Sequence, residues 1–216
     1  MNQWPRSLVV WMFLLGRAAV SMMSAGKTRQ MLPKGEIMLY ISGILTIAPD
    51  RFLSQLQEKT YETLKSLQIP FQRVETDEIV TMEDCVQVNQ KLDMKMVKTL
   101  FLCNQQRTEF YLFVTCGGKP FKSREFSAAL GVSRVSFAPI EMMEGMLGTK
   151  IGAATVFSVL LDADRKVRVV FDKDVVNEEW YGCSDGTNTG YMKIETVRIV
   201  KDFLSYAKHV PTVIRL

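Results

Sequence analysis

The chain has 216 residues, of which 47% are hydrophobic and 23% are charged, and its formal net charge is +4. This composition is typical of a soluble globular protein that buries one substantial core. The four cysteines show no CxxC spacing, and His209 is the only histidine, which argues against a zinc site and favours reduced cysteines in a cytosolic protein. We therefore expect no metal, no cofactor and a cytoplasmic location.

Residues 1–34 are treated separately from the fold. Arg6 precedes an apolar run at 8–15 that is too short to span a bilayer, so no membrane association is expected. The segment resembles a signal peptide in outline, but Arg17 interrupts that pattern and Met22, Met23 and Met31 offer later starts. We favour an N-terminal extension or an upstream start over export, and assign residues 35–216 to a single domain.

The first part of that domain opens with helices around a short strand. Residues 36–47 form either a strand or an apolar helix, because periodicity does not decide between them. Asp50 is expected to cap a helix over 51–67, and the alternation at 71–74 predicts a strand. Thr81 is expected to cap a second helix whose first turn is acidic.

The next stretch, 97–102, predicts a strand that pairs with 108–115 as an antiparallel hairpin. It contains one lysine, Lys98, and a central strand gains nothing from an ammonium group unless the charge faces a partner or a pocket. The alternative is a solvated lysine at a strand end, and the residues alone favour neither.

The remaining elements alternate without a regular order. The patterns predict a helix at 124–130 closed by Gly131, a helix at 140–147 between Pro139 and Gly148, strands at 155–161 and 167–171 joined by a turn at 162–165, a loop at 182–186, a strand at 191–194, a helix at 196–206 capped by Thr196, and a strand at 212–216. This order predicts an α+β fold with a mixed sheet in one domain. Internal repeats and the P-loop, GxGxxG and GxSxG motifs are absent from the sequence.

The positive charge is concentrated in one segment. Residues 95–150 hold eight Lys and Arg against four Glu, whereas the other residues balance at 19 against 19. A local basic excess of this kind suits an anionic ligand such as phosphate or nucleic acid.

Several short motifs occur in an order that resembles one known family. They are 68–71 (QIPF), 81–84 (TMED), 98–104 (KTLFLCN), 119–122 (KPFK), 134–138 (RVSFA), 147–153 (LGTKIGA), and Gly182-Cys183 followed by Asn188-Thr189. Together they resemble the freestanding prolyl-tRNA-editing proteins, relatives of YbaK and of the editing domains associated with aminoacyl-tRNA synthetases. The resemblance spans about residues 50–216.

The resemblance implies a curved mixed sheet with flanking helices. It also implies hydrolysis, in trans, of the ester of mischarged tRNA(Pro), with alanyl-tRNA(Pro) as the expected substrate. The partners would be the 3′ acceptor end of that tRNA and prolyl-tRNA synthetase. Lys98 matches the lysine of the family's site, and the substrate would contact Ser136, Gly148, Thr149, Ile151, Gly152, Ala153, Asn188 and Thr189.

The chain departs from the family's pattern at several positions. Ile151 stands where the family's glycine-rich loop has proline, and Ser184-Asp185 follow Gly182-Cys183 where relatives have His-Pro. Thr76 takes the place of a histidine, and Leu161-Asp162 the place of Asn-Asp. These departures make a second hypothesis credible: a non-catalytic module that binds tRNA or a synthetase. Lys98, Gly148 and Asn188-Thr189 around one cavity would favour the enzyme, whereas a cavity filled by Ile151 and Leu161 would favour the module.

Overall fold

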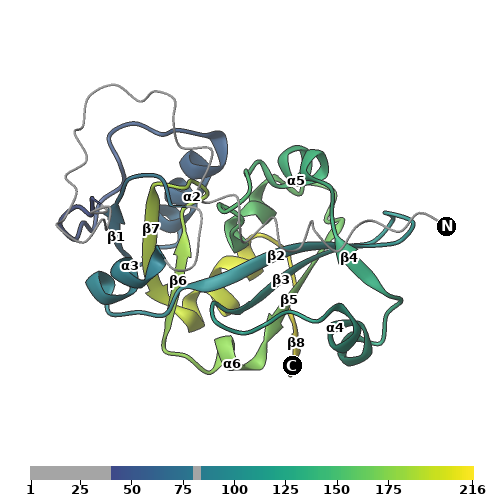
Figure 1. The fold of residues 1–216 in the computed structure, drawn as a ribbon. Coiled ribbons are helices and arrows are strands. Elements are labelled where there is room, and N and C mark those ends of the chain that lie inside the picture. Colours follow the sequence, from purple (N-terminus) through teal and green to yellow (C-terminus); the bar gives the residue numbers. More distant parts are fainter. Residues whose placement is uncertain (1–39, 80–83) are drawn as a thin grey trace, which may run out of the picture. The chain divides into compact units, whose positions relative to one another are not determined.

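The computed structural model describes residues 40–79 and 84–216, and Figure 1 shows their arrangement. The helices are α2 (Gln55–Ser66), α3 (Cys85–Leu92), α4 (Ser123–Leu130), α5 (Ile140–Leu147), the 3-10 helix η2 (Val156–Leu161), α6 (Lys173–Val176), the π-helical turn η3 (Arg198–Phe203) and α7 (Leu204–Tyr206). The strands are β1 (Gln72–Glu75), β2 (Val97–Asn104), β3 (Phe110–Cys116), β4 (Val135–Phe137), β5 (Val167–Asp172), β6 (Trp180–Ser184), β7 (Gly190–Glu195) and β8 (Thr212–Ile214).

The strands form two sheets. The five-stranded sheet has the order β4-β2-β3-β5-β8, in which β2 pairs antiparallel with β3 and β4, while β5 pairs parallel with β3 and β8. The three-stranded sheet, β1-β7-β6, is antiparallel throughout. A single parallel bridge between Met96 and Gly182 joins the two sheets just before β2 begins. This junction positions the site described below.

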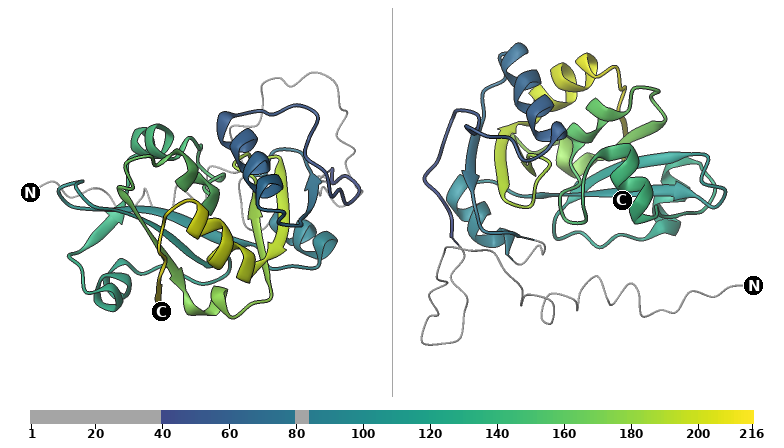
Figure 2. Two further views of the ribbon diagram at one scale, coloured as in Figure 1. Left: turned by 180° about the vertical axis from the view of Figure 1, so that it is seen from behind. Right: turned by 90° about the horizontal axis from the view of Figure 1, so that it is seen from above.

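Strand alternation divides the apolar side chains of the five-stranded sheet between two cores. Phe101, Leu112 and Val169 belong to the larger core, and Leu100, Phe113 and Val170 belong to the smaller one. The larger core also receives side chains from α2, η2 and η3, whose places are clear from behind and above in Figure 2. Phe126 of α4 closes the smaller core. The side of a strand on which a residue lies therefore tells which core it faces.

The α+β class and the mixed sheet are confirmed, as are two helix ends. Helix α4 ends at Gly131 with φ 67°, and α5 begins after Pro139 and ends at Gly148 with φ 62°. Glycine adopts such left-handed conformations at little cost, which is why both helices stop where the sequence predicted. The hairpin of β2 and β3 is also confirmed.

Two predictions about the strands were wrong. The predicted strand at 155–161 is instead the 3-10 helix η2 after Thr155, in which Val156, Phe157 and Val159 are buried together with no alternating face. Residues 182–186 are not all loop, since β6 runs through Ser184 by pairing with β7. Strands β2, β3 and β5 share the mixed sheet that the sequence predicted, and β1, β7 and β6 form a second sheet beside it.

The expected caps differ in detail. Ser54, not Asp50, caps α2 by accepting a hydrogen bond from the Gln57 amide at 3.1 Å. The hydroxyl of Thr196 caps nothing, and residues 41–47 make only isolated bridges through Ile41 and Leu45. The extension at 1–34 and the cap at Thr81 lie outside the described residues. Among the described residues, no helix is long and apolar enough to cross a membrane.

Candidate active site at the junction of the two sheets

The close approach of the two sheets depends on a glycine in β6. A Cβ atom on Gly182 would lie 2.8 Å from the carbonyl oxygen of Lys95 and 2.7 Å from the sulfur of Met94. No other residue allows the backbones of β6 and the start of β2 to approach so closely. Gly182 is thus needed for the parallel bridge to Met96 that joins the two sheets.

Lys98 lies two residues after this bridge on β2, as Ser184 does on β6. On β2, Lys98 lies on the same face as Leu100 of the smaller core, opposite Thr115 of β3. The Ser184 hydroxyl donates to the carbonyl of Ala153 at 3.1 Å. The hydrogen bonds of the described residues thus connect Ser184 to the glycine-bearing segment and Lys98 to Lys119.

The Lys98 ammonium group is half-buried and donates to the carbonyl of Lys119 at 2.5 Å. Burial lowers the pKa of this amine, and no ion pair joins it to a carboxylate among residues 40–79 and 84–216. By contrast, Lys119 is paired with both Asp172 and Asp174 at 2.8 Å. A half-buried cation that has no ion pair of its own among the described residues is suited to bind an anion that arrives with a ligand.

The glycine-bearing segment 148–153 has fixed ends and an exposed tip. A Cβ atom on Gly148 would lie 2.3 Å from a methyl carbon of Leu161, so the segment leaves α5 in close contact with η2. Thr149 and Ala153 are buried, whereas Ile151 is 43% exposed and Gly152, at φ 86°, is exposed beside it. Ile151 thus points outward and does not fill a cavity.

A second loop, 185–189, is organised by the buried carboxylate of Asp185. One oxygen accepts from Gln57 Nε2 at 2.7 Å and from the Tyr61 hydroxyl at 3.0 Å. The other accepts from the amide and the hydroxyl of Thr187, at 3.1 and 2.7 Å. A Cβ atom on Gly190 would lie 2.1 Å from this carboxylate, so glycine is required where the loop rejoins β7. These bonds fix the loop before any ligand binds.

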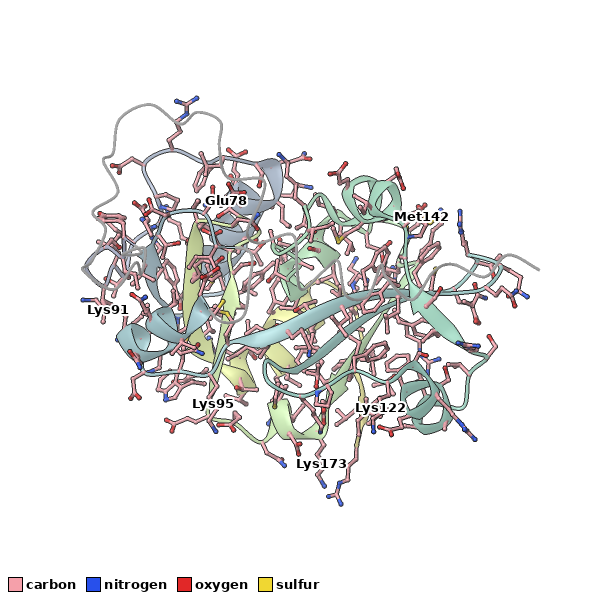
Figure 3. The ribbon with its side chains drawn as sticks, in the orientation of Figure 1. Glu78, Lys91, Lys95, Lys122, Met142 and Lys173 are labelled. Carbon is pink, nitrogen blue, oxygen red and sulfur yellow. The ribbon has the colours of Figure 1, made fainter. Side chains whose placement is uncertain are left out.

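The two loops meet through Asn188. Its amide nitrogen lies 3.4 Å from the carbonyl of Ile151 and 3.4 Å from the carboxylate of Glu78, which Figure 3 labels. The carbonyl of Asn188 accepts from the amide of Ile79 at 2.8 Å, and Thr189 accepts from that of Thr76 at 2.9 Å. The structure thus brings the predicted residues of 148–153 together with Asn188 and Thr189.

Two side-chain oxygens in these loops are buried without a hydrogen-bond partner: Thr149 Oγ1 and Asn188 Oδ1. Buried polar atoms are nearly always paired, and an unpaired one commonly marks the place of a water molecule or a ligand. One such atom in each loop indicates a polar binding position where the loops meet.

The buried thiol of Cys183 is not a suitable nucleophile. Burial raises its pKa well above the ordinary value, so the thiol stays protonated at neutral pH. Burial and the charge of Asp185 likewise raise the pKa of Tyr61. The arrangement favours chemistry by an oriented water molecule over a covalent intermediate.

Ser136 lies apart from the other predicted residues. It is exposed on β4 and pairs with Cys103, five residues along β2 from Lys98. At about 3.3 Å per residue, this places the Ser136 position roughly 17 Å from that of Lys98. The structure does not bring the two together.

Sequence reasoning missed the organising role of Asp185 and of its partners Gln57 and Tyr61. Ser184-Asp185 appeared only as a departure from the family, although an aspartate in a buried glycine-flanked loop is itself a signal of internal hydrogen bonding. Its donors lie 128 and 124 residues away along the chain. No local pattern links them.

Comparison with known proteins bears on this site. The chain is 26% identical over 161 residues to the prolyl-tRNA synthetase associated domain-containing protein 1 of Danio rerio, covering 74% of this chain and 86% of the relative. It is 29% identical over 113 residues to the prolyl-tRNA editing protein ProX of Acetoanaerobium sticklandii, covering 52% of this chain and 69% of the relative.

Solved structures share the fold. The hypothetical protein APE2540 aligns with a TM-score of 0.57 at 13% identity, covering 72% of this chain and 98% of that one. A candidate trans-editing enzyme for prolyl-tRNA synthetase aligns with a TM-score of 0.56 at 15% identity, covering 76% and 99%. At these identities the likeness concerns the fold alone.

The family model of the aminoacyl-tRNA editing domain matches residues 76–201, more than half of the chain. These residues include Lys98, both loops and the junction of the sheets. The match and the ProX relative place the protein among the hydrolases that deacylate aminoacyl-tRNA, as the sequence predicted. The chain belongs to the aminoacyl-tRNA editing domain family.

Proposed function

We propose that the protein hydrolyses the ester of mischarged tRNA(Pro) in trans in the cytoplasm, with alanyl-tRNA(Pro) as its substrate. The observation that carries this proposal is the meeting of 148–153 with Asn188 beside the sheet junction, within the matched editing domain. The name of the ProX relative supports prolyl-tRNA editing as the reaction.

In this proposal the 3′-terminal adenosine and its ester lie against the exposed backbone of Ile151 and Gly152. The unpaired oxygens of Thr149 and Asn188 hold the water molecule that attacks the ester carbonyl. Water adds its oxygen to the carbonyl carbon, the bond to the ribose oxygen breaks, and the ribose hydroxyl regains a proton. The products are alanine and uncharged tRNA.

Lys98 is proposed to supply the positive charge. Its ammonium group, bound only to a backbone carbonyl, would hold a phosphate of the acceptor end or the developing oxyanion. Prolyl-tRNA synthetase is the proposed partner, because one relative is named for association with it. A synthetase gains only about 1–3 kcal/mol from one methylene, so a separate small site is useful for removing alanine.

The experiment compares two isosteric substitutions. Thr149→Val removes an unpaired hydroxyl from the site, whereas Thr196→Val removes an equally buried, unpaired hydroxyl from the start of the C-terminal helical segment. Because each variant loses an unsatisfied polar atom, both should fold at least as stably as the parent protein. We expect deacylation of alanyl-tRNA(Pro) to fall roughly tenfold for Thr149→Val alone.

Equal rates for the parent and both variants would remove Thr149 from the site. Absence of hydrolysis by the parent protein, with tRNA binding retained, would instead favour the non-catalytic module.

A further inference from the structure

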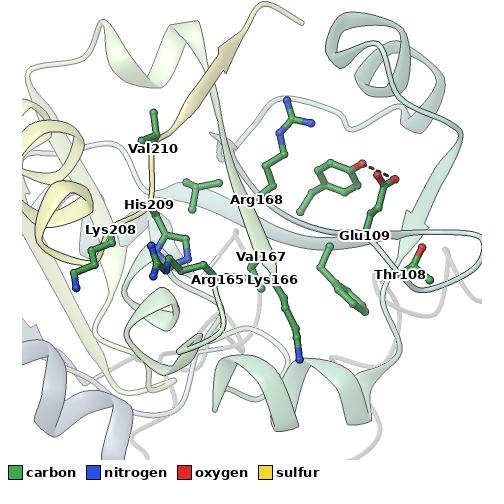
Figure 4. A pocket seen from close by; sticks show the side chains of 12 residues that line it. Thr108, Glu109, Arg165, Lys166, Val167, Arg168, Lys208, His209 and Val210 are labelled. Atoms are coloured by element: carbon green, nitrogen blue, oxygen red, sulfur yellow. Dashed lines mark hydrogen bonds between the residues drawn. The ribbon is translucent and has the colours of Figure 1, made fainter.

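A hollow in the surface lies away from the loops of the proposed ester site. It has a volume of about 370 Å³ and is lined by the start of β3, the turn and start of β5, and the loop after α7 (Figure 4). Because β3 and β5 are parallel, the hollow lies at the amino-terminal ends of both strands, whereas Lys119 and α6 follow their carboxyl-terminal ends.

The lining of this hollow is strongly basic. Arg165, Lys166, Arg168 and Lys208 are all exposed, with Lys166 paired to Asp164 at 2.8 Å, and Glu109 is the one acidic residue among the lining residues. Glu109 accepts hydrogen bonds from Tyr111 and Asn104 at 3.2 Å, so its carboxylate is already engaged. We call this surface the basic groove.

Electrostatic contrast with the other described hollow sets the basic groove apart. That hollow has a similar volume, about 350 Å³, but is lined by Glu178, Glu179 and Glu195 against a single Lys201. A general excess of lysine over the whole surface would not produce two hollows of opposite sign. The charge of the basic groove is a local property.

A buried pair holds the two sides of the basic groove together. The Asp162 carboxylate accepts from the amides of Lys166 and Val167, at 3.0 and 2.7 Å, and lies 3.2 Å from Nε2 of His209. Nδ1 of His209 lies 2.7 Å from the carbonyl of Ala207. These contacts tie the turn before β5 to the loop after α7. The cations on the two segments are therefore held on one surface.

The basic groove is also linked to the ester site. Leu161, whose side chain contacts the Gly148 position, directly precedes Asp162. The last residue of η2, Leu161, thus contacts the glycine-bearing segment, and the next residue, Asp162, makes the buried contacts that support the basic groove.

We propose that the basic groove binds the phosphodiester backbone of an RNA duplex, the acceptor arm of the tRNA whose 3′ end occupies the ester site. Exposed Arg and Lys side chains with little apolar surface are typical of backbone-phosphate contacts, whereas protein partners require an apolar centre. The proposal rests on the proposed function only in taking the RNA to be the substrate tRNA.

The test uses a triple variant, Arg165→Gln, Arg168→Gln and Lys208→Gln, in the full-length protein. Its matched control is Lys65→Gln, Lys91→Gln and Lys173→Gln, which removes the same charge from three exposed lysines on α2, α3 and α6, of which Figure 3 labels Lys91 and Lys173. Binding of uncharged tRNA(Pro) is measured by fluorescence anisotropy over a range of salt concentrations, after thermal unfolding shows that both variants are folded.

Each lost phosphate contact lowers the slope of log affinity against log salt by about 0.7–0.9. We expect the groove variant to bind tRNA roughly 10- to 100-fold more weakly at low salt, with a slope smaller by about 2–3. The control should keep the parent's slope. Unchanged affinity and slope in the groove variant, or an equal loss in the control, would overturn the proposal.

A short substrate separates this proposal from the proposed function. An alanyl ester of a 3′-terminal trinucleotide has no duplex, so the groove variant should cleave it at the parent's rate while its KM for alanyl-tRNA(Pro) rises. Slower cleavage of the trinucleotide ester would overturn the groove's assignment to the duplex. If the parent cleaves neither substrate, the proposed function fails, and the binding slopes still decide the groove.

Discussion

The sheet junction buries its polar groups, whereas the basic groove exposes its charged side chains to solvent. At the junction, polar groups are buried: Asp185 is fully enclosed by four hydrogen bonds, and Lys98 is half-buried against a carbonyl. In the basic groove, four cations are exposed and the Asp162–His209 pair beneath them is buried. The buried hydrogen bonds at the junction hold polar atoms in fixed positions, whereas the exposed cations of the basic groove can contact a charged ligand.

This difference matches two separate tasks in recognising a charged nucleic acid. Ester hydrolysis by water depends on geometry, which buried and fully bonded groups provide. Affinity for a phosphate backbone depends on exposed cations and on salt, and carries little geometric demand. The following predictions test the junction's side of this comparison, from the largest expected effect to the smallest.

Removal of the Asp185 carboxylate should cause the largest loss of stability. Asp185→Ala leaves Gln57, Tyr61 and Thr187 buried without an acceptor, so the free energy of unfolding should fall by roughly 3–5 kcal/mol in urea denaturation. Asp174→Ala, which removes an exposed carboxylate from Lys119, is the control and should change stability by less than about 1 kcal/mol. Similar small losses for both would mean that Asp185 does not organise the loop.

Lys98→Ala should have the largest effect on the reaction. Loss of a charge aimed at phosphate or at the oxyanion removes about 2–4 kcal/mol of transition-state stabilisation, so deacylation should fall by roughly 10²–10³. Because no carboxylate is left unpaired among the described residues, the melting temperature should change little. A variant with normal deacylation would exclude Lys98 from the mechanism.

Gly182→Ala should disturb the junction itself. The added methyl group would lie 2.8 Å from the carbonyl oxygen of Lys95, so β6 and β2 must separate, and we expect a loss of about 1–3 kcal/mol together with slower deacylation. Gly118→Ala is the matched control, since its Cβ would meet no atom within 4 Å. A tolerated Gly182→Ala with full activity would show that the close approach is unnecessary.

Alkaline pH should produce the smallest effect. The thiol of Cys183 has a raised pKa in the folded state, so it contributes stability below its ordinary pKa near 9, and that stability is lost as pH rises. Between pH 8 and 10 the free energy of unfolding should fall by about 1 kcal/mol more in the parent than in Cys183→Ala. Parallel pH profiles for the two proteins would contradict the burial of this thiol.

The sequence predicted elements whose signals are local. Gly131 and Gly148 end their helices through a backbone conformation that glycine favours, and the run of strand-forming residues around Leu100 forms β2. Residues 155–161 were misread because an apolar run buried on all sides has no period that separates helix from strand. The strand at Gly182–Ser184 depends on β7 and on Met96, which no local pattern indicates.

The candidate site was only partly accessible from the sequence. The resemblance named Gly148, Ile151 and Asn188, and the structure brings these together. The role of Asp185 depends on a hydrogen bond from Gln57, which lies more than a hundred residues away in the sequence. The basic groove depends on the contact between buried His209 and Asp162, which brings the segments of Lys208 and Arg165 together. The basic excess read at 95–150 does not contain the four cations of the groove.

The most direct test of the central claim is single-turnover deacylation of one tRNA(Pro) preparation charged with either alanine or proline. The proposal of a site that accepts a small amino acid predicts that the parent protein hydrolyses the alanyl ester at least about tenfold faster than the prolyl ester, and that Lys98→Ala slows the alanyl ester to near the uncatalysed rate. Hydrolysis of neither ester above the uncatalysed rate, or equal rates for both, would contradict it.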